Sequence, residues 1–147
     1  MIREEKRDLF TVPQGYYLAH CISSDFALGA GIAKQFNEVF DMAHKLKTER
    51  ELYLEIGVGE LGNVGSAVII DNVFNLITKE KYWNKPTYET LFFALTDMKN
   101  YMDEHFITKL AMPKIGCGLD RLSWDVVLEE IEIIFNEDVY DILICTL

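Results

Sequence analysis

The residues best suited to chemistry lie in one short loop, PKIGCGLDRL, at positions 113–122. Gly116 and Gly118 have no Cβ, so the backbone can adopt positive φ and bring N–H groups close to an anion. A helix that starts near Ser123 would add free N–H groups and a favourable dipole. The loop could therefore wrap a phosphate, and it carries a carboxylate at Asp120. Considered alone, it is equally well explained as a strand-to-helix turn without a ligand.

Two other segments offer groups that such a site would use. Gly29-Ala30-Gly31-Ile32-Ala33 is a run of mostly small residues at a predicted helix entry, where the backbone can approach a ligand closely. Leu76-Ile77-Thr78-Lys79 ends an apolar strand on a primary amine. An isolated lysine at a strand end is usually solvated, and an isolated aspartate usually occupies a turn. Lys79 and Asp120 become a nucleophile and an acid/base only if the fold brings them together.

The three cysteines, Cys21, Cys117 and Cys145, are far apart and form no CxxC pair. This argues against a disulfide framework and against a structural zinc site. Cys117 invites a nucleophile hypothesis, but no motif supplies a histidine partner, and a small apolar side chain between two glycines explains it adequately. No cluster of histidine, cysteine and acidic residues has the spacing of metal ligands. We therefore expect reduced thiols, no metal and no cofactor.

Length and composition indicate one ordinary domain over residues 1–147. Half of the residues are hydrophobic and 12% are aromatic, which excludes disorder. No apolar run reaches the roughly 18 residues of a membrane-spanning helix, and the charged N-terminus lacks the pattern of a secretory signal. We expect a cytoplasmic monomer without membrane contact. The net charge of −10 opposes broad nucleic-acid binding, so an anionic ligand would need a locally positive pocket.

Apolar periodicity and glycine punctuation predict strands that alternate with helices. The predicted strands are residues 16–22, 67–70, 73–77, 109–112 and 140–146, with a weaker signal in the polar segment 3–6. The predicted helices are residues 29–40, continuing over 41–51, then 87–106 and 123–135. The side chains expected to point inward from the last two helices are Leu91, Leu95, Met98, Met102, Val126, Val127, Ile131, Ile134 and Phe135. Asp71-Asn72 suits a tight turn between antiparallel strands. The pattern predicts a three-layer α/β fold with functional groups on loops at strand ends.

The order of these segments resembles the macrodomain family from Asp8 to Leu147. Within that family it is similar to the lysine-dependent branch that contains the terminal ADP-ribose protein glycohydrolase and related bacterial antitoxin macrodomains. The resemblance rests on Arg7-Asp8-Leu9-Phe10, Ala19-His20-Cys21-Ile22-Ser23, Gly29-Ala30-Gly31-Ile32-Ala33, Ile77-Thr78-Lys79, Lys85-Pro86-Thr87-Tyr88-Glu89 and the 113–122 loop. It implies an α/β fold, a three-layer α/β/α macrodomain with a mixed central sheet. Arg7 replaces the family's usual glycine, and residues 51–66 resemble the family least, so altered substrate contacts are expected there.

The resemblance implies a pocket for ADP-ribose. Its matched binding positions are Asp8, Leu9, His20, Ser23, Gly29, Ala30, Gly31, Ile32, Gly116, Cys117, Gly118 and Leu119. Asp8 and the backbone at Leu9 match the adenine contact, residues 29–32 match the loop at the distal ribose, and residues 116–119 match the loop whose amides hold the diphosphate. Ser23 matches a secondary ribose contact. His20 lies within an apolar strand, where a histidine is more often a hydrogen-bonded core residue than a base.

The resemblance also implies that Lys79 is the catalytic lysine and that Asp120 is its partner carboxylate. In the family mechanism the amine attacks the anomeric carbon of the distal ribose after ring opening, giving a covalent lysyl-ADP-ribose intermediate, while the aspartate manages protons. The implied activity removes mono-ADP-ribose from modified glutamate or aspartate side chains of proteins, with deacetylation of O-acetyl-ADP-ribose as a further activity. Lys81 and Lys85 are alternatives for general attraction of phosphate.

Three other function classes stay open at the level of sequence. A non-catalytic reader of ADP-ribose would keep the glycine loops and Asp8 but would need neither Lys79 nor Asp120. A hydrolase of ADP-ribosylated DNA bases would use the same pocket, although the acidic composition argues modestly against DNA. A purely structural interaction domain would leave the glycine-rich and lysine-bearing segments unexplained. The presence of both Lys79 and Asp120 favours catalysis.

Overall fold

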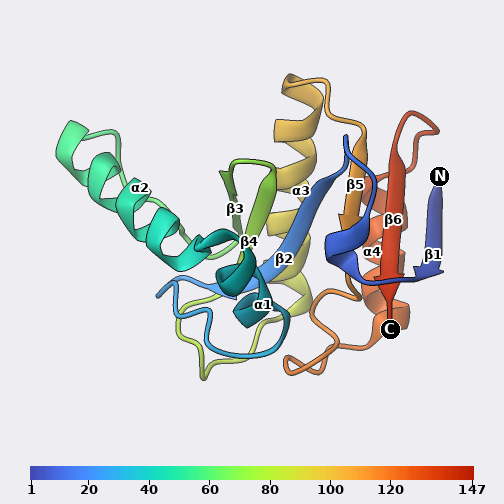
Figure 1. Ribbon diagram of the computed structural model, residues 1–147, viewed down its shortest axis with the longest axis horizontal. Helices are drawn as coiled ribbons and strands as arrows, with labels where there is room; N and C mark the ends of the chain where they lie inside the picture. Colours follow the sequence, from blue (N-terminus) through green and yellow to red (C-terminus); the bar gives the residue numbers. More distant parts are fainter.

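One six-stranded sheet runs through the computed structural model, which describes residues 1–147 (Figure 1). The strands are β1 (Ile2–Lys6), β2 (Tyr17–Ser23), β3 (Ser66–Ile70), β4 (Val73–Lys79), β5 (Lys109–Met112) and β6 (Asp141–Thr146). Their order across the sheet is β1-β6-β5-β2-β4-β3. All neighbouring pairs are parallel except β3 and β4, which are antiparallel across the turn at Asp71. The mixed sheet expected from the sequence is therefore confirmed.

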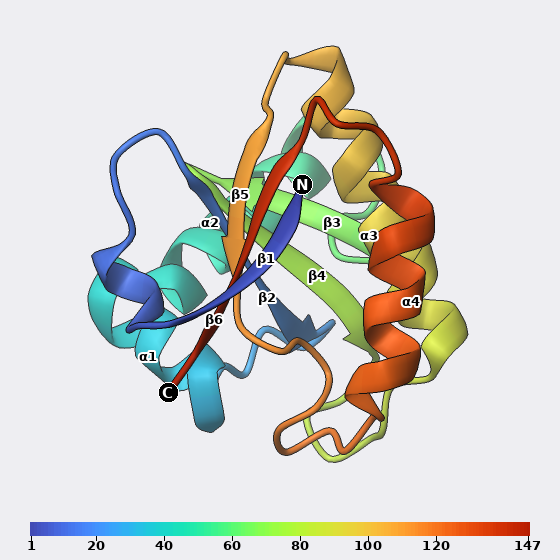
Figure 2. The same cartoon turned by 90° about the vertical axis from the view of Figure 1, so that its right-hand side faces the viewer.

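Four α-helices cover the two faces of this sheet. They are α1 (Gly31–Phe40), α2 (Met42–Ile56), α3 (Tyr88–Glu104) and α4 (Trp124–Ile134), and a short 3-10 helix, η1, spans Leu9–Thr11. Figure 2 shows α1 and α2 on one side of the sheet and α3 and α4 on the other. This is the predicted three-layer α/β/α arrangement. None of these helices has both the length and the apolarity needed to cross a membrane.

The side chains of strand β4 pack into the cores on both faces of the sheet. Its side chains alternate, so Phe74 and Leu76 pack toward α3 and α4, whereas Val73 and Ile77 pack toward α1 and α2. Near-continuous apolar sequence is typical of a strand buried on both faces, and six of the seven residues of β4 are buried. This central position fixes the end of β4, where Lys79 emerges.

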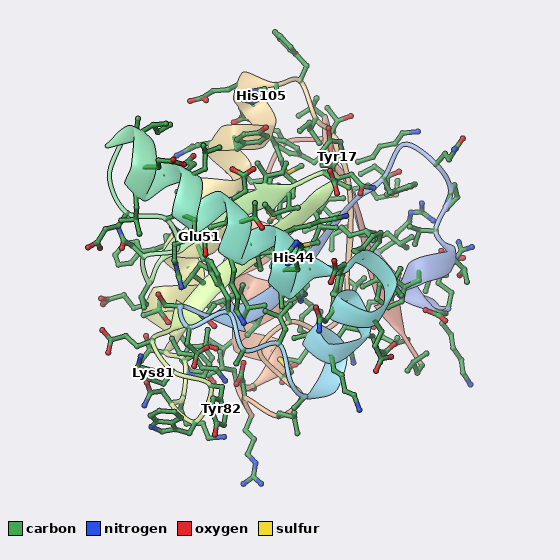
Figure 3. All side chains as sticks on the ribbon, turned by 60° about the vertical axis from the view of Figure 1, so that its left-hand side comes forward. Tyr17, His44, Glu51, Lys81, Tyr82 and His105 are labelled. Atoms are coloured by element: carbon green, nitrogen blue, oxygen red, sulfur yellow. The ribbon has the colours of Figure 1, made fainter.

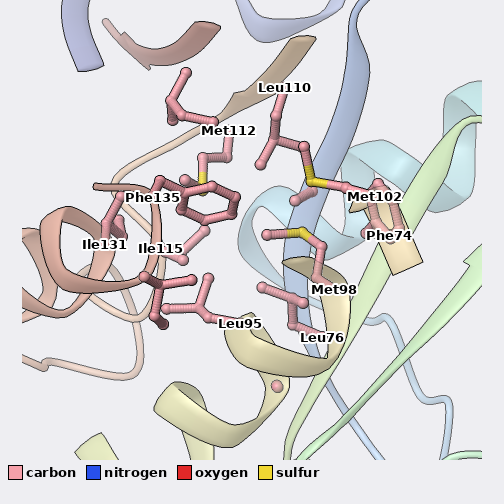
Figure 4. Packing of buried hydrophobic residues seen from close by; sticks show 14 of the residues in the cluster. Phe74, Leu76, Leu95, Met98, Met102, Leu110, Met112, Ile115, Ile131 and Phe135 are labelled. Carbon is pink, nitrogen blue, oxygen red and sulfur yellow. The ribbon is translucent and has the colours of Figure 1, made fainter. Parts of the chain in front are cut away.

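The larger core cluster lies between the sheet and the helices α3 and α4 (Figure 4). Leu91, Leu95, Met98 and Met102 form the predicted stripe on α3, and all four are fully buried. Thr87 caps this helix by accepting a hydrogen bond from the backbone N–H of Thr90. Burial of each large apolar side chain contributes about 1.5–3 kcal/mol to the free energy of unfolding. The packed face therefore provides a rigid support for the loops at the strand ends.

Two details differ from the sequence-based expectation. Residues 29–51 are not one continuous helix, because Asp41 adopts φ 55° and separates α1 from α2. Val126 does not point inward: it is exposed on α4, while Val127, Ile131, Ile134 and Phe135 are buried. Val127 shares one helix face with Ile131 and Ile134, whereas Val126 lies about 100° away around the helix axis. The weak strand signal at residues 3–6 does correspond to a strand, β1.

Glu130 on α4 is expected to make folding stability depend on pH. Its Oε2 atom is buried without a hydrogen-bond partner, and this burial raises the pKa of Glu130 to about 7 from an ordinary value of 4.5. Between these two pH values the folded chain binds more protons than the unfolded chain, so stability falls as the pH rises. We expect Glu130→Gln to raise the urea midpoint at pH 8 and to leave it nearly unchanged at pH 4.5.

The matched control for this substitution is Glu129→Gln, since Glu129 is the neighbouring residue on α4 and is exposed. It should leave the urea midpoint the same at both pH values. An equal effect of Glu130→Gln at pH 4.5 and pH 8 would show that ionisation of this carboxyl is not the cause.

Candidate active site

A cleft lies at the carboxyl ends of the adjacent parallel strands β2, β4 and β5, and its volume is about 670 Å³. The residues that line it are Cys21, Ile22, Ser23, Ala27, Leu28, Gly29, Ala30, Gly31, Ile32, Ala33, Lys79, Tyr82, Lys85, Pro113, Lys114, Ile115, Gly116, Gly118, Leu119 and Asp120. Ser23 is the last residue of β2 and Lys79 is the last residue of β4. Ligands of open α/β sheets characteristically bind outside the carboxyl ends of the strands.

Lys79 and Asp120 meet in the wall of this cleft. The Nζ atom of Lys79 donates a hydrogen bond to Oδ1 of Asp120 at 2.7 Å, and the side chains are only 14% and 16% exposed. They come from different segments, β4 and the loop between β5 and α4, and are 41 residues apart in sequence. The structure thus brings together the amine and the carboxylate that sequence analysis assigned to catalysis.

The loop that carries Asp120 presents several backbone donors. Within it, the amides of Cys117, Arg121 and Leu122 bond to carbonyls of the same loop, whereas those of Gly118, Leu119 and Asp120 have no backbone partner. On the other side of the cleft, the N-terminus of α1 has no side-chain cap at Ala30. Unpaired N–H groups at a helix start and in a glycine loop favour an anion such as phosphate. The two groups of amides flank the same cleft.

Gly116 is needed for the shape of this loop. Its φ is +73°, and a Cβ added there would lie 2.9 Å from Cδ1 of Leu122. The N–H of Leu122 also donates to the carbonyl of Gly116 at 2.7 Å, which closes the loop. An L-residue with a side chain is strained at this φ.

We expect Gly116→Ala to lower the free energy of unfolding by about 1–2 kcal/mol. Gly118→Ala is the matched control, because a Cβ at Gly118 meets no atom within 4 Å and its φ is not positive. Urea unfolding of both variants checks the difference. Equal losses would mean that Gly116 is not restricted by its backbone conformation.

The cleft is locally positive although the chain carries a net charge of −10. Lys79, Lys85 and Lys114 line it, and Asp120 is the only acidic residue among the lining side chains. Lys85 also donates from Nζ to the carbonyl of Leu119 at 3.2 Å, joining the loop after β4 to the glycine loop. The arrangement provides the positive pocket that an anionic ligand requires. Lys85 is one of the two lysines proposed from sequence for attraction of phosphate.

Comparisons with known proteins agree with this geometry. Human ADP-ribose glycohydrolase OARD1 is 40% identical over 142 residues, which cover 97% of this chain and 89% of the human protein. The structure of the macrodomain of Mycobacterium tuberculosis DarG superposes with a TM-score of 0.82 at 22% identity, covering 100% of this chain and 98% of that one. The chain belongs to the macrodomain family. This confirms the family predicted from the sequence.

A third similarity concerns the fold of this macrodomain alone. The Thermosipho africanus DarTG structure, which is in complex with ADP-ribose, matches with a TM-score of 0.76 at 16% identity and covers 99% of this chain and 42% of that one. No protein-family model matches the chain.

His20, included among the ligand contacts from the resemblance, does not line the cleft; it is the hydrogen-bonded core residue that its apolar surroundings indicated. The imidazole is 0% exposed, its Nε2 bonds to Oδ1 of Asn75 at 2.6 Å, and its ring stacks on Phe36. Burial lowers the pKa of His20 to about 4, so the ring is neutral. His20 lies on the sheet face toward α1, as Ile22 does, and it is the three residues nearer the carboxyl end of β2, Cys21, Ile22 and Ser23, that line the cleft.

Asp8, Leu9 and Cys117 also lie outside the lining of the cleft. Asp8 is exposed and caps η1, accepting a hydrogen bond from the N–H of Phe10 at 3.0 Å, while Leu9 is buried in the core. The Sγ of Cys117 donates to the carbonyl of Ile115, and burial raises the pKa of the thiol. A protonated thiol is a poor nucleophile, which supports the structural interpretation of Cys117. The other matched binding residues line the cleft.

Tyr82 is a lining residue that sequence analysis missed. It lies in the loop after β4, where its ring contacts that of Trp83 edge to face, and the two side chains are 63% and 65% exposed. The N–H of Tyr82 donates to Oδ2 of Asp25 at 3.0 Å, which anchors the loop. Two adjacent aromatic residues between Lys81 and Lys85 in a polar loop were the available signal, because exposed aromatic residues on loops often contact ligands.

Proposed function

We propose that this macrodomain is an ADP-ribose glycohydrolase that removes mono-ADP-ribose from modified glutamate and aspartate side chains of proteins. The observation that carries the proposal is the contact between Lys79 and Asp120, 2.7 Å apart in the wall of the cleft. The 40% identity to human ADP-ribose glycohydrolase OARD1 supports the same activity. A reader of ADP-ribose would need no amine and carboxylate pair beside its ligand.

The proposed ligand position follows from the polar groups of the cleft. The unpaired amides of residues 118–120 and the start of α1 donate to the diphosphate, and Lys85 and Lys114 supply opposite charge. The distal ribose then lies beside Ser23, Gly29–Gly31, Lys79 and Asp120. The small residues at positions 29–31 allow the backbone to approach the sugar. Asp8 remains the proposed adenine contact, reached only if the ligand extends beyond the cleft.

The proposed chemistry uses Lys79 as a nucleophile. Its neutral amine forms a C–N bond to the anomeric carbon of the distal ribose as the bond to the ester oxygen breaks, and the leaving carboxylate takes the electron pair. Asp120 accepts the proton lost by the amine. Water then attacks the same carbon: Asp120 returns its proton to the departing amine and accepts one from the water, which restores Lys79 and releases ADP-ribose, and this last proton passes to the released carboxylate. The sum is one ester and one water converted to ADP-ribose and a carboxylic acid.

Two related substrates share this bond type or this ligand. O-acetyl-ADP-ribose carries an ester on the same ribose, so we include its deacetylation in the proposal. DNA-linked ADP-ribose is a second candidate, because Lys79, Lys85 and Lys114 surround the cleft and the exposed rings of Tyr82 and Trp83 could stack on a base. This local positive charge weakens the argument that the net charge makes against DNA.

Incubating the protein with glutamate-linked, serine-linked and DNA-linked ADP-ribose side by side tests the assignment. We expect ADP-ribose to be released from the glutamate linkage at least about tenfold faster than from the others, because a carboxylate is the better leaving group. Release measured by chromatography gives the rates. Faster release from DNA would show that DNA-linked ADP-ribose is the preferred substrate. No release from any of the three substrates would reject the glycohydrolase activity.

A further inference from the structure

A second groove, of about 540 Å³, lies next to the cleft on the side of α2. Its lining residues are Ser24, Asp25, Arg50, Leu54, Glu60, Leu61, Asn63, Glu80 and Lys81. Four of these, Leu54, Glu60, Leu61 and Asn63, belong to residues 51–66, the stretch least similar to the family. In Figure 3, α2 crosses the front of the molecule, and Lys81 and Tyr82 lie together below it.

The groove and the cleft share one wall. The N–H of Ser24 donates to the carbonyl of Lys79 at 2.8 Å, and that of Asp25 donates to the carbonyl of Glu80 at 3.1 Å. Ser23 and Lys79 line the cleft, whereas the next residues, Ser24, Glu80 and Lys81, line the groove. Glu80 and Lys81 directly follow Lys79 in the chain, and one residue of extended chain spans about 3.3 Å. The backbone of the groove wall therefore begins within a few ångströms of the backbone of the proposed nucleophile.

The groove is held in shape by internal contacts. Arg50 places its guanidinium 3.7 Å from the centre of the Phe26 ring and donates to the carbonyls of Ser24 and Leu61. The hydroxyl of Ser24 donates to the carbonyl of Gly62 at 2.7 Å. These contacts tie α2 and the loop that follows it to the end of β2. A groove with fixed walls binds a partner at a lower cost in conformational entropy.

Acidic side chains outnumber basic ones in the groove lining, with Asp25, Glu60 and Glu80 against Arg50 and Lys81, and they differ in which are held by internal contacts. The guanidinium of Arg50 is engaged with carbonyls and the Phe26 ring, and the carboxylate of Asp25 accepts from Ser23, Ala27 and Tyr82. Glu60 and Glu80 are exposed and make no side-chain ion pair, and Lys81 is the one cation left beside them. Leu54 adds an exposed apolar surface. Two carboxylates and a leucine suit a basic polypeptide and repel a phosphate backbone.

We propose that this acceptor groove binds the polypeptide segment that carries the ADP-ribosylated carboxylate, with preference for lysine or arginine beside the modified residue. This inference rests on the proposed function, because the modified side chain must reach Lys79. It names the substrate class more narrowly: proteins modified within a basic sequence. The loop with Tyr82 and Trp83 then separates the sugar in the cleft from the polypeptide in the groove.

The test uses two synthetic peptides that carry one mono-ADP-ribosyl glutamate, flanked either by lysines or by glutamates. Their dissociation constants are measured in a Lys79→Ala background so that the ester stays intact, with free ADP-ribose as the baseline for each variant. We expect the lysine-flanked peptide to bind about fivefold more tightly at low salt, and the ratio to shrink in 0.5 M salt. Adding Glu60→Gln and Glu80→Gln should bring the ratio close to one.

The matched control adds Glu104→Gln and Glu137→Gln, two exposed glutamates outside the groove, which change the net charge equally. This control should keep the fivefold ratio. Equal affinity for the two peptides, or the same ratio in both double-glutamine variants, would overturn the acceptor groove. Hydrolysis of the same peptides is measured separately, with the protein in which Lys79 is intact. Absence of ADP-ribose release would reject the proposed function, whereas the ratio of the two peptide affinities would still show whether the acceptor groove binds basic polypeptide.

Discussion

Replacing Lys79 with alanine is expected to lower the rate of ADP-ribose release by at least about 10³-fold. The amine of Lys79 is the only nucleophile in the proposed route, and no other lysine contacts Asp120. Affinity for ADP-ribose should change by less than about threefold, since we propose that the diphosphate is held by the glycine loop, the start of α1, Lys85 and Lys114, which all line the cleft. Single-turnover release and calorimetric binding measure the two quantities independently.

Two further variants show whether the amine itself is required. Lys79→Arg keeps a positive charge beside Asp120 but removes the nucleophilic amine, because a guanidinium stays protonated. It should be as inactive as Lys79→Ala. Lys47→Ala removes an exposed lysine of α2 that lies outside the cleft, and its turnover should equal that of the unchanged protein. Appreciable turnover by Lys79→Arg would reject the covalent route and leave the lysine an electrostatic role.

The elements that position Lys79 could be predicted because their sequence signals are strong. The turn at Asp71-Asn72 and the apolar run before Lys79 predicted an antiparallel pair, and β3 and β4 form it. The apolar stripe on α3 predicted the helix that packs under this pair. Hydrophobic periodicity alone, however, does not predict that the side chains of Lys79 and Asp120 lie close together. That expectation came from the resemblance to a family, and the structure places the two side chains 2.7 Å apart.

The differences between expectation and structure arise where backbone conformation or tertiary packing, and not the linear pattern, decides the outcome. His20 directly precedes three cleft residues of β2, but its own side chain is buried in the core against Phe36. Asp41 breaks the predicted long helix by adopting φ 55°, a conformation that sequence only weakly signals for aspartate. The sequence predicted altered substrate contacts over residues 51–66, but it could not predict the acceptor groove, because the walls of the groove come from three segments that only the fold brings together.

Asp120→Ala should slow release of ADP-ribose by about 10²–10⁴-fold, the usual effect of losing a general base. In the first step water can replace Asp120 as acceptor of the proton lost by the amine of Lys79, whereas the second step needs Asp120 to move protons between the attacking water and the departing amine. The covalent intermediate should therefore accumulate on Lys79. Intact-mass measurement after mixing with glutamate-linked substrate would show a fraction of the protein heavier by one ADP-ribosyl group.

The position of the adduct separates this mechanism from nonspecific attachment of the sugar to surface amines. The double variant Lys79→Ala and Asp120→Ala should show no added mass, because the nucleophile is absent. Asp125→Ala removes an exposed carboxylate from the first turn of α4 and should neither slow release nor leave an adduct. A slow Asp120→Ala enzyme that never carries added mass would mean that loss of the proton transfer from Lys79 already prevents the C–N bond from forming, so that the second step is not the one that depends most on Asp120. The 2.7 Å contact between Lys79 and Asp120 would then describe the proton transfer that limits the rate of the reaction.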